Sequence, residues 1–493
     1  MATFDGLTEA GYPEPAGAAL AAVETVSVDP PQEQVDPRPG DPPVARIRPR
    51  VQRRRTRSVT GWPLRALLLG YPLWWMLGIA PLVWRIFAIP MLVHLRRKRP
   101  IHYPPMFWIW GLFLTLVLIS GLMINVHAPD TVPVNSGAGH YIAYAIRLFN
   151  YLSVTIVLIY AGNLTESELP RMSLIRWLSY VFVITVLGGL AGTFAPRFSY
   201  DSPLAKVLPA SLQSIDFVQT FIHVTTAQTQ AQLGFPRPSA PFEYANSWGN
   251  NYSMLLAWFL IGGLIFASNR RRAVTLVVLG ISAVPVIYSQ NRGMWVGLVI
   301  AVTYVALRFA LRRRFGLLVA LVASVALVGG VVLVSPLQQV ITARLQTPNS
   351  NEVRGSLGAL SVQLAESSAI IGYGSTRSTI GSDKSATIGQ SPGCPRCGNR
   401  VIGSTGQLWL VLVAQGFVGG ALYLLFLFQG VIRYWRDHSY VGIAGTLALI
   451  LAVFYSFFYT AVVSPLGITF LSLALLWRNA EVRANPVSEP DES

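Results

Sequence analysis

The sequence predicts an all-α integral membrane protein with about twelve transmembrane helices, both termini cytosolic, and a large outer loop with short helices. Of its 493 residues, 52% are hydrophobic and only 12% are charged, with a mean hydropathy of +0.48. This composition is typical of membrane proteins. Apolar stretches long enough to span a bilayer recur from Trp62 to Trp477, and basic residues gather in the short loops between them.

The two ends of the chain differ from this apolar middle. Residues 1–60 are rich in Pro, Ala, Asp and Glu, and finish with seven arginines between Arg46 and Arg57. No apolar segment follows the initiator, so we expect no cleavable signal peptide. We predict a disordered cytosolic tail over 1–60, with its basic end against anionic lipid headgroups. The transmembrane domain is expected over 61–480, and 481–493 form a second cytosolic tail.

Twelve apolar segments define the predicted topology. They lie at about 64–80, 82–95, 104–124, 140–161, 174–194, 247–267, 273–288, 294–310, 316–335, 406–429, 441–460 and 463–477. The first two share Pro81, so they form either a helical hairpin or one long kinked helix, which would invert everything after it. The hairpin puts the basic clusters Arg96–Arg99, Arg270–Arg272 and Arg312–Arg314 on the cytosolic side, as the positive-inside rule requires.

The same distribution of charge indicates which partners the protein binds. The net charge is +16, but the basic residues lie in loops between apolar segments. A nucleic-acid surface would be a folded basic face with aromatic residues interleaved. We therefore expect membrane lipid as a partner and no nucleic acid.

Two long loops, at about 195–245 and 335–405, fall on the outer face in this topology. Pro209–Gln230 mixes apolar and polar residues at near-helical spacing, which predicts an interfacial amphipathic helix. Val353–Glu366 also has helical spacing, and Gly372–Ser375 then breaks it.

The two cysteines, Cys394 and Cys397, form a lone CxxC in the second of these loops. Such a pair is a redox pair, half of a zinc site or a local disulfide. No second CxxC completes an all-cysteine zinc site. Because the predicted topology places the loop in the oxidising compartment, we favour a structural disulfide.

Arg292 lies at the membrane edge between two apolar stretches, which is a costly position for a charge. It is flanked by Gln290, Asn291 and Gly293. The guanidinium offers a planar fork of donors that suits phosphate oxygens, and glycine permits close approach of a ligand. The alternative is an anchor that extends to the lipid headgroups.

Further polar residues precede or follow the outer ends of other spans. Arg237, Glu243 and Asn246 lie just before one span, Arg354 lies in the large loop, and Gln407 begins a later span. Helix capping by asparagine and a solvated arginine are the simpler explanations. Together, however, the arginines, the acid and the amides suit an anionic, membrane-embedded substrate such as a lipid diphosphate. Histidine is scarce and the outer loops contain no DxD-like pair, so we expect no metal and a metal-independent reaction.

Five motifs, taken in order, resemble the O-antigen ligase/polymerase superfamily of polytopic membrane glycosyltransferases. They are R-x-S-A-P-F-x-Y-x-N at 237–246, S-Q-N-R-G at 289–293, N-x-V-R at 351–354, I-I-G-Y-G at 370–374 and G-Q-L-W-L-V-L-V-A-Q-G at 406–416. The resemblance covers roughly 60–480. Members act outside the cytoplasmic membrane on glycans carried by undecaprenyl diphosphate: ligases transfer the glycan to an acceptor, and polymerases extend it.

The resemblance implies roles for individual residues. Arg237 and Arg292 match the arginines expected to bind the donor diphosphate, and Arg354 matches the loop arginine. Ligases typically carry a His-Asn pair that assists the acceptor hydroxyl where this chain has Thr405 and its neighbour Gly406. We therefore take Glu243 as the candidate for acid–base chemistry.

These observations together predict an inverting, metal-independent glycosyltransferase without a cofactor in the cytoplasmic membrane, acting in cell-surface polysaccharide biosynthesis. The substrate-binding residues would be Arg354, Asn246, Gln290, Asn291 and Gln407. The donor would be a polyprenyl-diphosphate-linked glycan and the acceptor another glycan or an envelope component, with polysaccharide-assembly proteins as further partners. The alternatives are a transporter or flippase of lipid-linked glycan and an inactive, glycan-binding relative.

Overall fold

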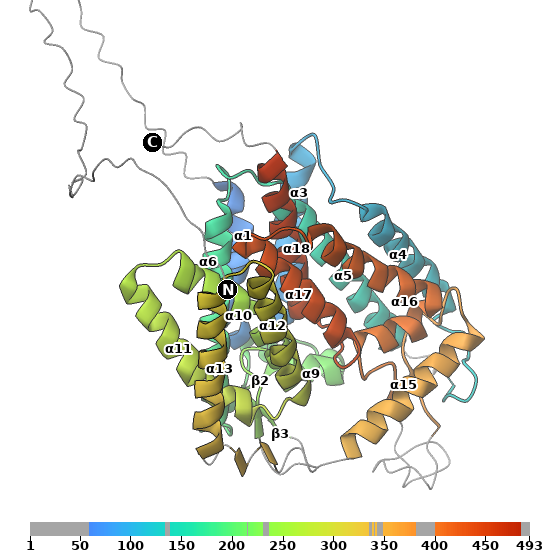
Figure 1. Cartoon of the computed structure of the whole chain (residues 1–493). Helices are drawn as coiled ribbons and strands as arrows, with labels where there is room; N and C mark the ends of the chain where they lie inside the picture. Colours follow the sequence, from blue (N-terminus) through green and yellow to red (C-terminus); the bar gives the residue numbers. More distant parts are fainter. Residues whose placement is uncertain are drawn as a thin grey trace, which may run out of the picture. The chain divides into compact units, whose positions relative to one another are not determined.

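Helices account for 74% of the structure, and the described residues contain no closed sheet, which confirms the all-α class. The structure is a computed structural model, shown in Figure 1. The residues that it describes are 59–133, 139–213, 215–229, 236–334, 338–339, 341–342, 349–380 and 400–484, all within one compact unit. Cys394 and Cys397 lie outside these ranges, as do the chain ends 1–58 and 485–493.

Apart from α15, which falls in the predicted outer loop, the longer helices correspond to predicted apolar segments. In the first half they are α3 (Ala80–Arg97), α4 (Phe107–Ser120), α5 (Gly139–Asn163), α6 (Arg171–Phe194) and α10 (Ala245–Leu260). In the second half they are α11 (Asn269–Tyr288), α12 (Arg292–Ala310), α13 (Phe315–Val334), α15 (Asn349–Ser367), α16 (Gln407–Tyr434), α17 (Tyr440–Ser456) and α18 (Val463–Ala484).

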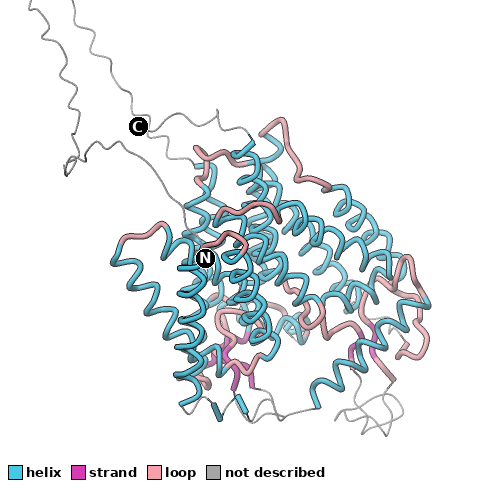
Figure 2. The backbone as a smooth tube through the Cα atoms, viewed as in Figure 1, coloured by secondary structure: helices cyan, strands magenta, loops and turns pink. Residues whose placement is uncertain are grey.

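Shorter elements complete the fold, and the strands all lie at one end of the helical bundle (Figure 2). The short helices are η1 (Val59–Gly61), α1 (Trp62–Leu69), α2 (Tyr71–Met76), η2 (Gly121–Met123), α7 (Pro203–Val207), α8 (Ala210–Gln213), α9 (Asp216–Ile222) and η3 (Ile261–Ile265). The strands form three antiparallel pairs: β1 (Ser199–Asp201) with β2 (His223–Thr225), β3 (Ala227–Thr229) with β4 (Pro236–Pro238), and β5 (Arg377–Ser378) with β6 (Val401–Ile402).

The first two apolar segments form a hairpin, as the distribution of charge predicts. Helices α1 and α2 run to Gly78, which has a φ of +74° that glycine adopts without strain, and α3 then returns. The two ends of this hairpin both contact Tyr160 of α5. The hydroxyl of Tyr160 in α5 donates to the carbonyl of Thr60, and its ring lies edge-on to His94, with ring centroids 5.6 Å apart.

Polar contacts tie the basic loops together at the end of the bundle that lies opposite the strands. Lys98 after α3 pairs with Glu168 before α6. Arg483 in α18 pairs with Asp437 before α17 at 2.5 Å, and Arg308 near the end of α12 donates to the Asp437 carbonyl. The predicted cytosolic loops are therefore neighbours in space.

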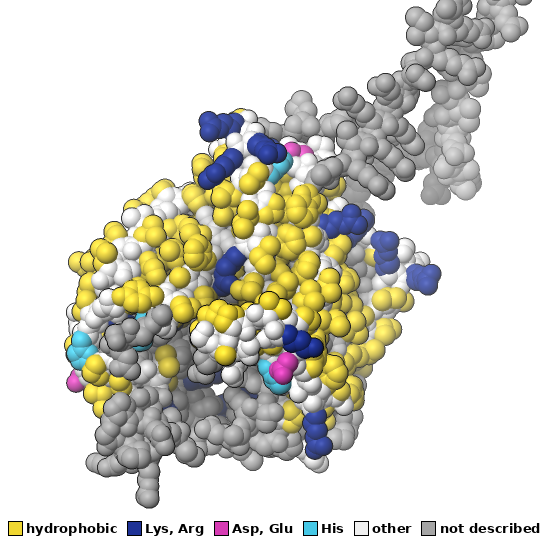
Figure 3. Space-filling model, turned by 180° about the vertical axis from the view of Figure 1, so that it is seen from behind, with side chains coloured by type: hydrophobic (Ala, Val, Ile, Leu, Met, Phe, Trp, Pro, Cys, Tyr) yellow, Lys and Arg dark blue, Asp and Glu magenta, His cyan; other side chains and the backbone are white. Residues whose placement is uncertain are grey.

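Five of the described helices are long and apolar enough to cross a membrane: α5, α6, α11, α12 and α16. Shorter apolar stretches lie at Phe107–Met123, Phe315–Leu327 and Tyr440–Ser456. Hydrophobic side chains cover much of the flank of the molecule (Figure 3). These observations support a membrane protein, whereas the predicted count of twelve spans stays a prediction.

Small residues let the central helices approach closely, which matters in lipid because water no longer drives helices together. Gly162 in α5 faces the ring of Trp477, and Gly467 in α18 faces the ring of Trp84; a methyl group at either glycine would overlap the ring. Around them Trp110 contacts Phe470, with ring centroids 4.9 Å apart. Helices α3, α5 and α18 therefore form a closely packed core.

Helix α16 is interrupted at Gly416, where φ is +68°. The chain after α15 forms hydrogen bonds with the backbone groups that the interruption leaves without a helical partner. The N–H of Tyr373 donates to the Val413 carbonyl at 2.9 Å, and the N–H of Phe417 donates to the Ala369 carbonyl at 2.7 Å. Backbone polar groups at membrane depth need such partners. This part of the predicted large outer loop thus packs against the helical bundle.

One predicted element differs from the structure and one agrees with it. The helix expected over Pro209–Gln230 is two short helices, α8 and α9, and β2 begins at His223. Antiparallel pairing of β2 with β1 satisfies the backbone there, which helical spacing alone could not foresee. The helix expected over Val353–Glu366 is confirmed as α15, and the predicted break follows at Gly372, with φ +70°.

Candidate functional site

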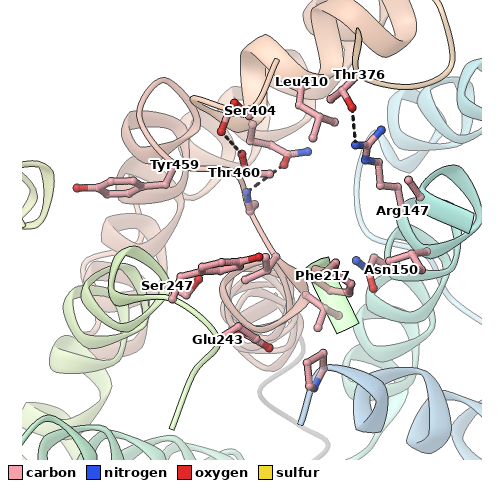
Figure 4. A pocket seen from close by; sticks show the side chains of 18 of the residues that line it. Arg147, Asn150, Phe217, Glu243, Ser247, Thr376, Ser404, Leu410, Tyr459 and Thr460 are labelled. Atoms are coloured by element: carbon pink, nitrogen blue, oxygen red, sulfur yellow. Dashed lines mark hydrogen bonds between the residues drawn. The ribbon is translucent and has the colours of Figure 1, made fainter. Parts of the chain in front are cut away.

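A cavity of about 530 Å³ lies at the strand-bearing end of the bundle, where several of the predicted outer loops meet. The lining residues come from α3, α5, α9, α10, α15, α16 and α18, from strands β3 and β6, and from the loops before α10, α16 and α18. Its lining residues with a charged or amide side chain are Arg85, Arg147, Asn150, Gln228, Glu243, Asn246, Arg354 and Gln407. Figure 4 shows several of these side chains pointing toward the cavity.

Glu243 lies in the lower half of the view in Figure 4, in the loop that leads into α10. Both carboxylate oxygens are buried, and neither accepts a hydrogen bond from another described residue. Burial raises the pKa of Glu243 from 4.5 to about 7, against the opposing effects of its own N–H and of Arg85. A carboxyl group with this pKa can take up or release a proton near neutral pH.

Two arginines approach the cavity from the first half of the chain. Arg85 of α3 donates through Nε and Nη2 to Oδ1 of Asn150, at 3.1 and 2.6 Å. Arg147 of α5 donates to Ser375 Oγ at 3.1 Å and to Thr376 Oγ1 at 3.3 Å. All of these partners are neutral, so both guanidinium groups keep their full charge beside the cavity.

A third arginine, Arg354, comes from α15 in the predicted large outer loop. Nη1 of Arg354 donates to the Phe458 carbonyl at 3.1 Å, and its guanidinium lies 5.8 Å from the ring centre of Tyr459. Among the described residues, Arg354, Arg85 and Arg147 form no ion pair with a carboxylate. The cavity therefore has an excess of positive charge.

Gln407 fastens the start of α16 to two other elements. Its Nε2 donates to the Tyr151 hydroxyl at 2.7 Å, and its Oε1 accepts from the Ala461 N–H at 3.0 Å. Both polar ends of the side chain are thus used by the protein. The nearby Thr405 also lines the cavity, and its buried hydroxyl has no hydrogen-bond partner among the described residues.

The two arginines singled out by the motifs, Arg237 and Arg292, are not among the residues that line the cavity. Arg237 is only 4% exposed; its Nε donates to the Ser289 carbonyl at 2.6 Å and its Nη2 donates to Asn246 Oδ1 at 3.1 Å. Arg292 is half-buried at the start of α12. Asn246 lines the cavity, so Arg237 holds one lining residue in position.

The polar residues before Arg292 serve the local fold. Asn291 caps α12, since its Oδ1 accepts from the Met294 N–H at 3.0 Å, and it also accepts from the Tyr459 hydroxyl. Gln290 has a φ of +49° and is 6% exposed. Neither residue lines the cavity, and their predicted contact with substrate stays a prediction.

Sequence reasoning missed Arg85, Arg147, Asn150 and Tyr151. The signal was present, because Arg85 and Arg147 interrupt the apolar segments 82–95 and 140–161, where charge is costly. Both lie far from the family motifs along the chain, and only the fold brings them to Glu243.

No cluster of three His, Cys, Asp or Glu side chains occurs in the part of the chain that the structure describes. Whether the reaction needs a metal stays a prediction. Comparisons of the chain with protein-family models, with curated proteins and with solved structures find no match.

Proposed function

We propose that the protein is a membrane glycosyltransferase of the O-antigen ligase/polymerase type, acting on glycans carried by a polyprenyl diphosphate. The observation that carries this proposal is the cavity with three arginines outside ion pairs and one buried carboxyl group. A lipid diphosphate that carries a glycan has two negative charges. Arg85, Arg147 and Arg354 supply three positive charges, of which Glu243 offsets at most one.

In the proposed reaction an acceptor hydroxyl attacks the anomeric carbon of the donor from the face opposite the diphosphate. The new carbon–oxygen bond forms as the bond to the diphosphate oxygen breaks, so the configuration inverts. Glu243, as carboxylate, takes the hydroxyl proton. The arginines stabilise the charge that develops on the departing diphosphate.

The residues taken from the motifs have a supporting place in this proposal. Arg237 holds Asn246 at the cavity and joins this loop to the carbonyl of Ser289. Arg292, three residues further on, would reach the diphosphate from the side of α12. Thr405 leaves the position of the ligase histidine without a base, which favours Glu243 in that role.

The proposed topology has twelve spans with both chain ends in the cytosol. The contacts between the basic loops support it, because they gather those loops at the end of the bundle that lies opposite the cavity. The cavity would then face the outside of the cytoplasmic membrane, where lipid-linked glycans are polymerised or transferred.

The test is transfer in proteoliposomes that contain a polyprenyl-diphosphate-linked glycan. Arg354→Gln keeps a polar side chain but removes the charge, and we expect at least about a 100-fold loss of transfer rate, as when one group that stabilises the transition state is lost. Arg197→Gln is the matched control, because Arg197 is exposed after α6, near the same end, and does not line the cavity.

The outcomes separate the proposed enzyme from its rivals. Equal transfer by the wild type and the Arg354 variant would contradict the arginine's role. Movement of lipid-linked glycan across the bilayer, without any new glycosidic bond, would identify a transporter instead. Binding of the glycan without transfer or movement would identify an inactive relative.

A further inference from the structure

Three segments of the chain meet at the end of the bundle that lies opposite the strands (Figure 1). They are the connection from η3 to α11, the turn between α12 and α13, and the start of α17. The ring of Phe266 in the first segment lies edge-on to the ring of Tyr440 in the third, with ring centroids 6.3 Å apart. This aromatic contact brings the two segments together.

Two arginines flank the aromatic pair. Nη1 of Arg314, in the turn before α13, donates to the Tyr440 hydroxyl at 3.3 Å. Nε of Arg272 in α11 donates at 3.0 Å to the carbonyl of Leu264, two residues before Phe266. Phe266, Arg272, Arg314 and Tyr440 are here called the Tyr440 cluster. Because the partners of both guanidinium groups are neutral, both charges stay available to an anion.

The surroundings of the Tyr440 cluster are strongly positive. Arg272 ends one run of arginines, 270–272, and Arg314 ends another, 312–314; all six are exposed. Within the described ranges none of the six forms an ion pair with a carboxylate. Asp437, three residues before Tyr440, pairs with Arg483 instead. Charges of one sign in two neighbouring loops attract an anion.

Apolar side chains lie beside these charges. Phe266 is 50% exposed, and Leu311 and Phe315, which stand on either side of the second run, are 64% and 61% exposed. Trp435, in the loop before α17, is also partly exposed, and its ring lies 5.4 Å from the guanidinium of Arg308. Aromatic rings next to basic residues are typical of the level at which lipid headgroups meet acyl chains.

We propose that the Tyr440 cluster binds the headgroup of an anionic phospholipid. Arg272 and Arg314 hold phosphate oxygens, and Phe266, Leu311 and Phe315 contact the acyl chains. A lipid with two phosphates binds more tightly than a lipid with one, because two runs of arginines are available. A soluble phosphate compound would make no use of the apolar side chains. This site is separate from the cavity and does not depend on the reaction proposed there.

Titration of the purified full chain with lipid in a neutral detergent, followed by native mass spectrometry, tests the proposal. The probe is cardiolipin, an anionic phospholipid with two phosphates. We expect phosphatidylglycerol, with one phosphate, to bind more weakly, and phosphatidylcholine, with no net charge, to bind most weakly. Binding of cardiolipin should weaken as the salt concentration rises, because salt screens exposed charges.

Substitution of both arginines tests which residues hold the lipid. Arg272→Gln with Arg314→Gln should weaken the binding of cardiolipin at least about 10-fold, as expected when two basic residues beside an anionic headgroup are lost. The matched control is Arg96→Gln with Arg97→Gln, which removes two exposed arginines from the end of α3 and should bind as the wild type does. The basic segment Arg46–Arg57 is present in every variant, so its own attraction for lipid does not alter the comparison.

A second double variant separates charge from loop position. Arg272→Lys with Arg314→Lys keeps both charges and loses only the planar fork, so it should bind cardiolipin more tightly than the glutamine variant does. Equal binding by the lysine and glutamine variants would assign the loss to the position of the loops and overturn the proposed anion site.

Three other results would also overturn the proposal. Equal weakening by the Arg96 and Arg97 control would show a general attraction to net charge. Equal binding of phosphatidylcholine and cardiolipin would show that the phosphates are not recognised. Displacement of cardiolipin by an equal concentration of inorganic pyrophosphate would identify a site for a soluble anion. None of these results would affect the proposed transfer at the cavity.

Discussion

Replacing Glu243 with glutamine should make the protein more stable and at the same time inactive. The carboxyl oxygens are buried and accept no hydrogen bond from another described side chain or backbone group, and burial raises the pKa from 4.5 to about 7. Each unit of difference between the two pKa values corresponds to about 1.4 kcal/mol, so ionising Glu243 in the folded state costs about 3 kcal/mol. Glutamine has nearly the same shape and stays neutral at every pH.

The direction in which pH changes the stability follows from proton binding. Because the folded state holds this proton more tightly than the unfolded state, the stability that Glu243 contributes in its protonated form is fully present below pH 4.5. It is lost as the pH rises through about 7. The Glu243→Gln variant should therefore match the wild type at pH 4.5 and exceed it at pH 8, by up to about 3 kcal/mol. Thermal unfolding in detergent at both pH values measures the difference.

Transfer activity should move in the opposite direction. A positioned general base contributes roughly 100- to 10,000-fold, so Glu243→Gln should lower kcat by at least about 100-fold. In the wild type kcat/KM should rise as the pH passes through about 7, where the carboxylate forms, and this rise should disappear in the variant. Proteoliposomes with lipid-linked glycan provide the assay.

The combination of results excludes misfolding as the cause, because a damaged fold would not gain stability. Glu243→Asp keeps the charge and shortens the side chain, so it should retain part of the rate and the pH dependence. Normal transfer by Glu243→Gln, with an unchanged pH profile, would refute the assignment of the base. Equal stability of variant and wild type at pH 8 would refute the reasoning about burial.

Three other substitutions test how the outer loops are held. Gln407→Leu strands the buried hydroxyl of Tyr151, so unfolding free energy should fall by about 1–3 kcal/mol, seen as a lower thermal midpoint in detergent. Arg377→Lys removes a guanidinium whose Nη2 lies within 3.3 Å of four backbone carbonyl oxygens, so hydrogen exchange in the chain around it should become faster while a distant helix is unchanged. Gly416→Ala places a methyl group against backbone at a φ of +68° and should destabilise by roughly 1–3 kcal/mol, whereas Gly111→Ala, in open space, should not.

Most of the long apolar helices could be predicted from the sequence, because a bilayer restricts which segments can cross it. A long apolar run must satisfy its backbone internally, so its length and the adjoining charges identify it. The hairpin around Gly78 follows from the same reasoning, since another arrangement would send the basic loops to opposite ends. Helix α15 was also predictable from spacing, although it lies in a loop.

The candidate site was only partly predictable. Glu243 and Arg354 were selected from the sequence, and both line the cavity. Arg237 was selected for the same reason, yet its side chain does not line the cavity. It donates hydrogen bonds to the Ser289 carbonyl and to the Asn246 side-chain amide. A motif shows that a residue type matters at a position, and it does not show whether the side chain points outward or inward. Arg147 was missed because its partners lie more than 200 residues away.

The position of Glu243 in the same cavity as the three arginines fits its proposed role as the base. A base that takes the acceptor proton while the donor diphosphate departs has to lie close to the cations that hold the diphosphate. A bound diphosphate would also raise the pKa of the carboxyl group further, because a nearby negative charge disfavours ionisation. Glu243 would then accept the hydroxyl proton more readily when the lipid diphosphate is in place than when it is absent. A pH profile of kcat shifted upward from that of kcat/KM would be the signature of this coupling, since the two report the occupied and the empty cavity.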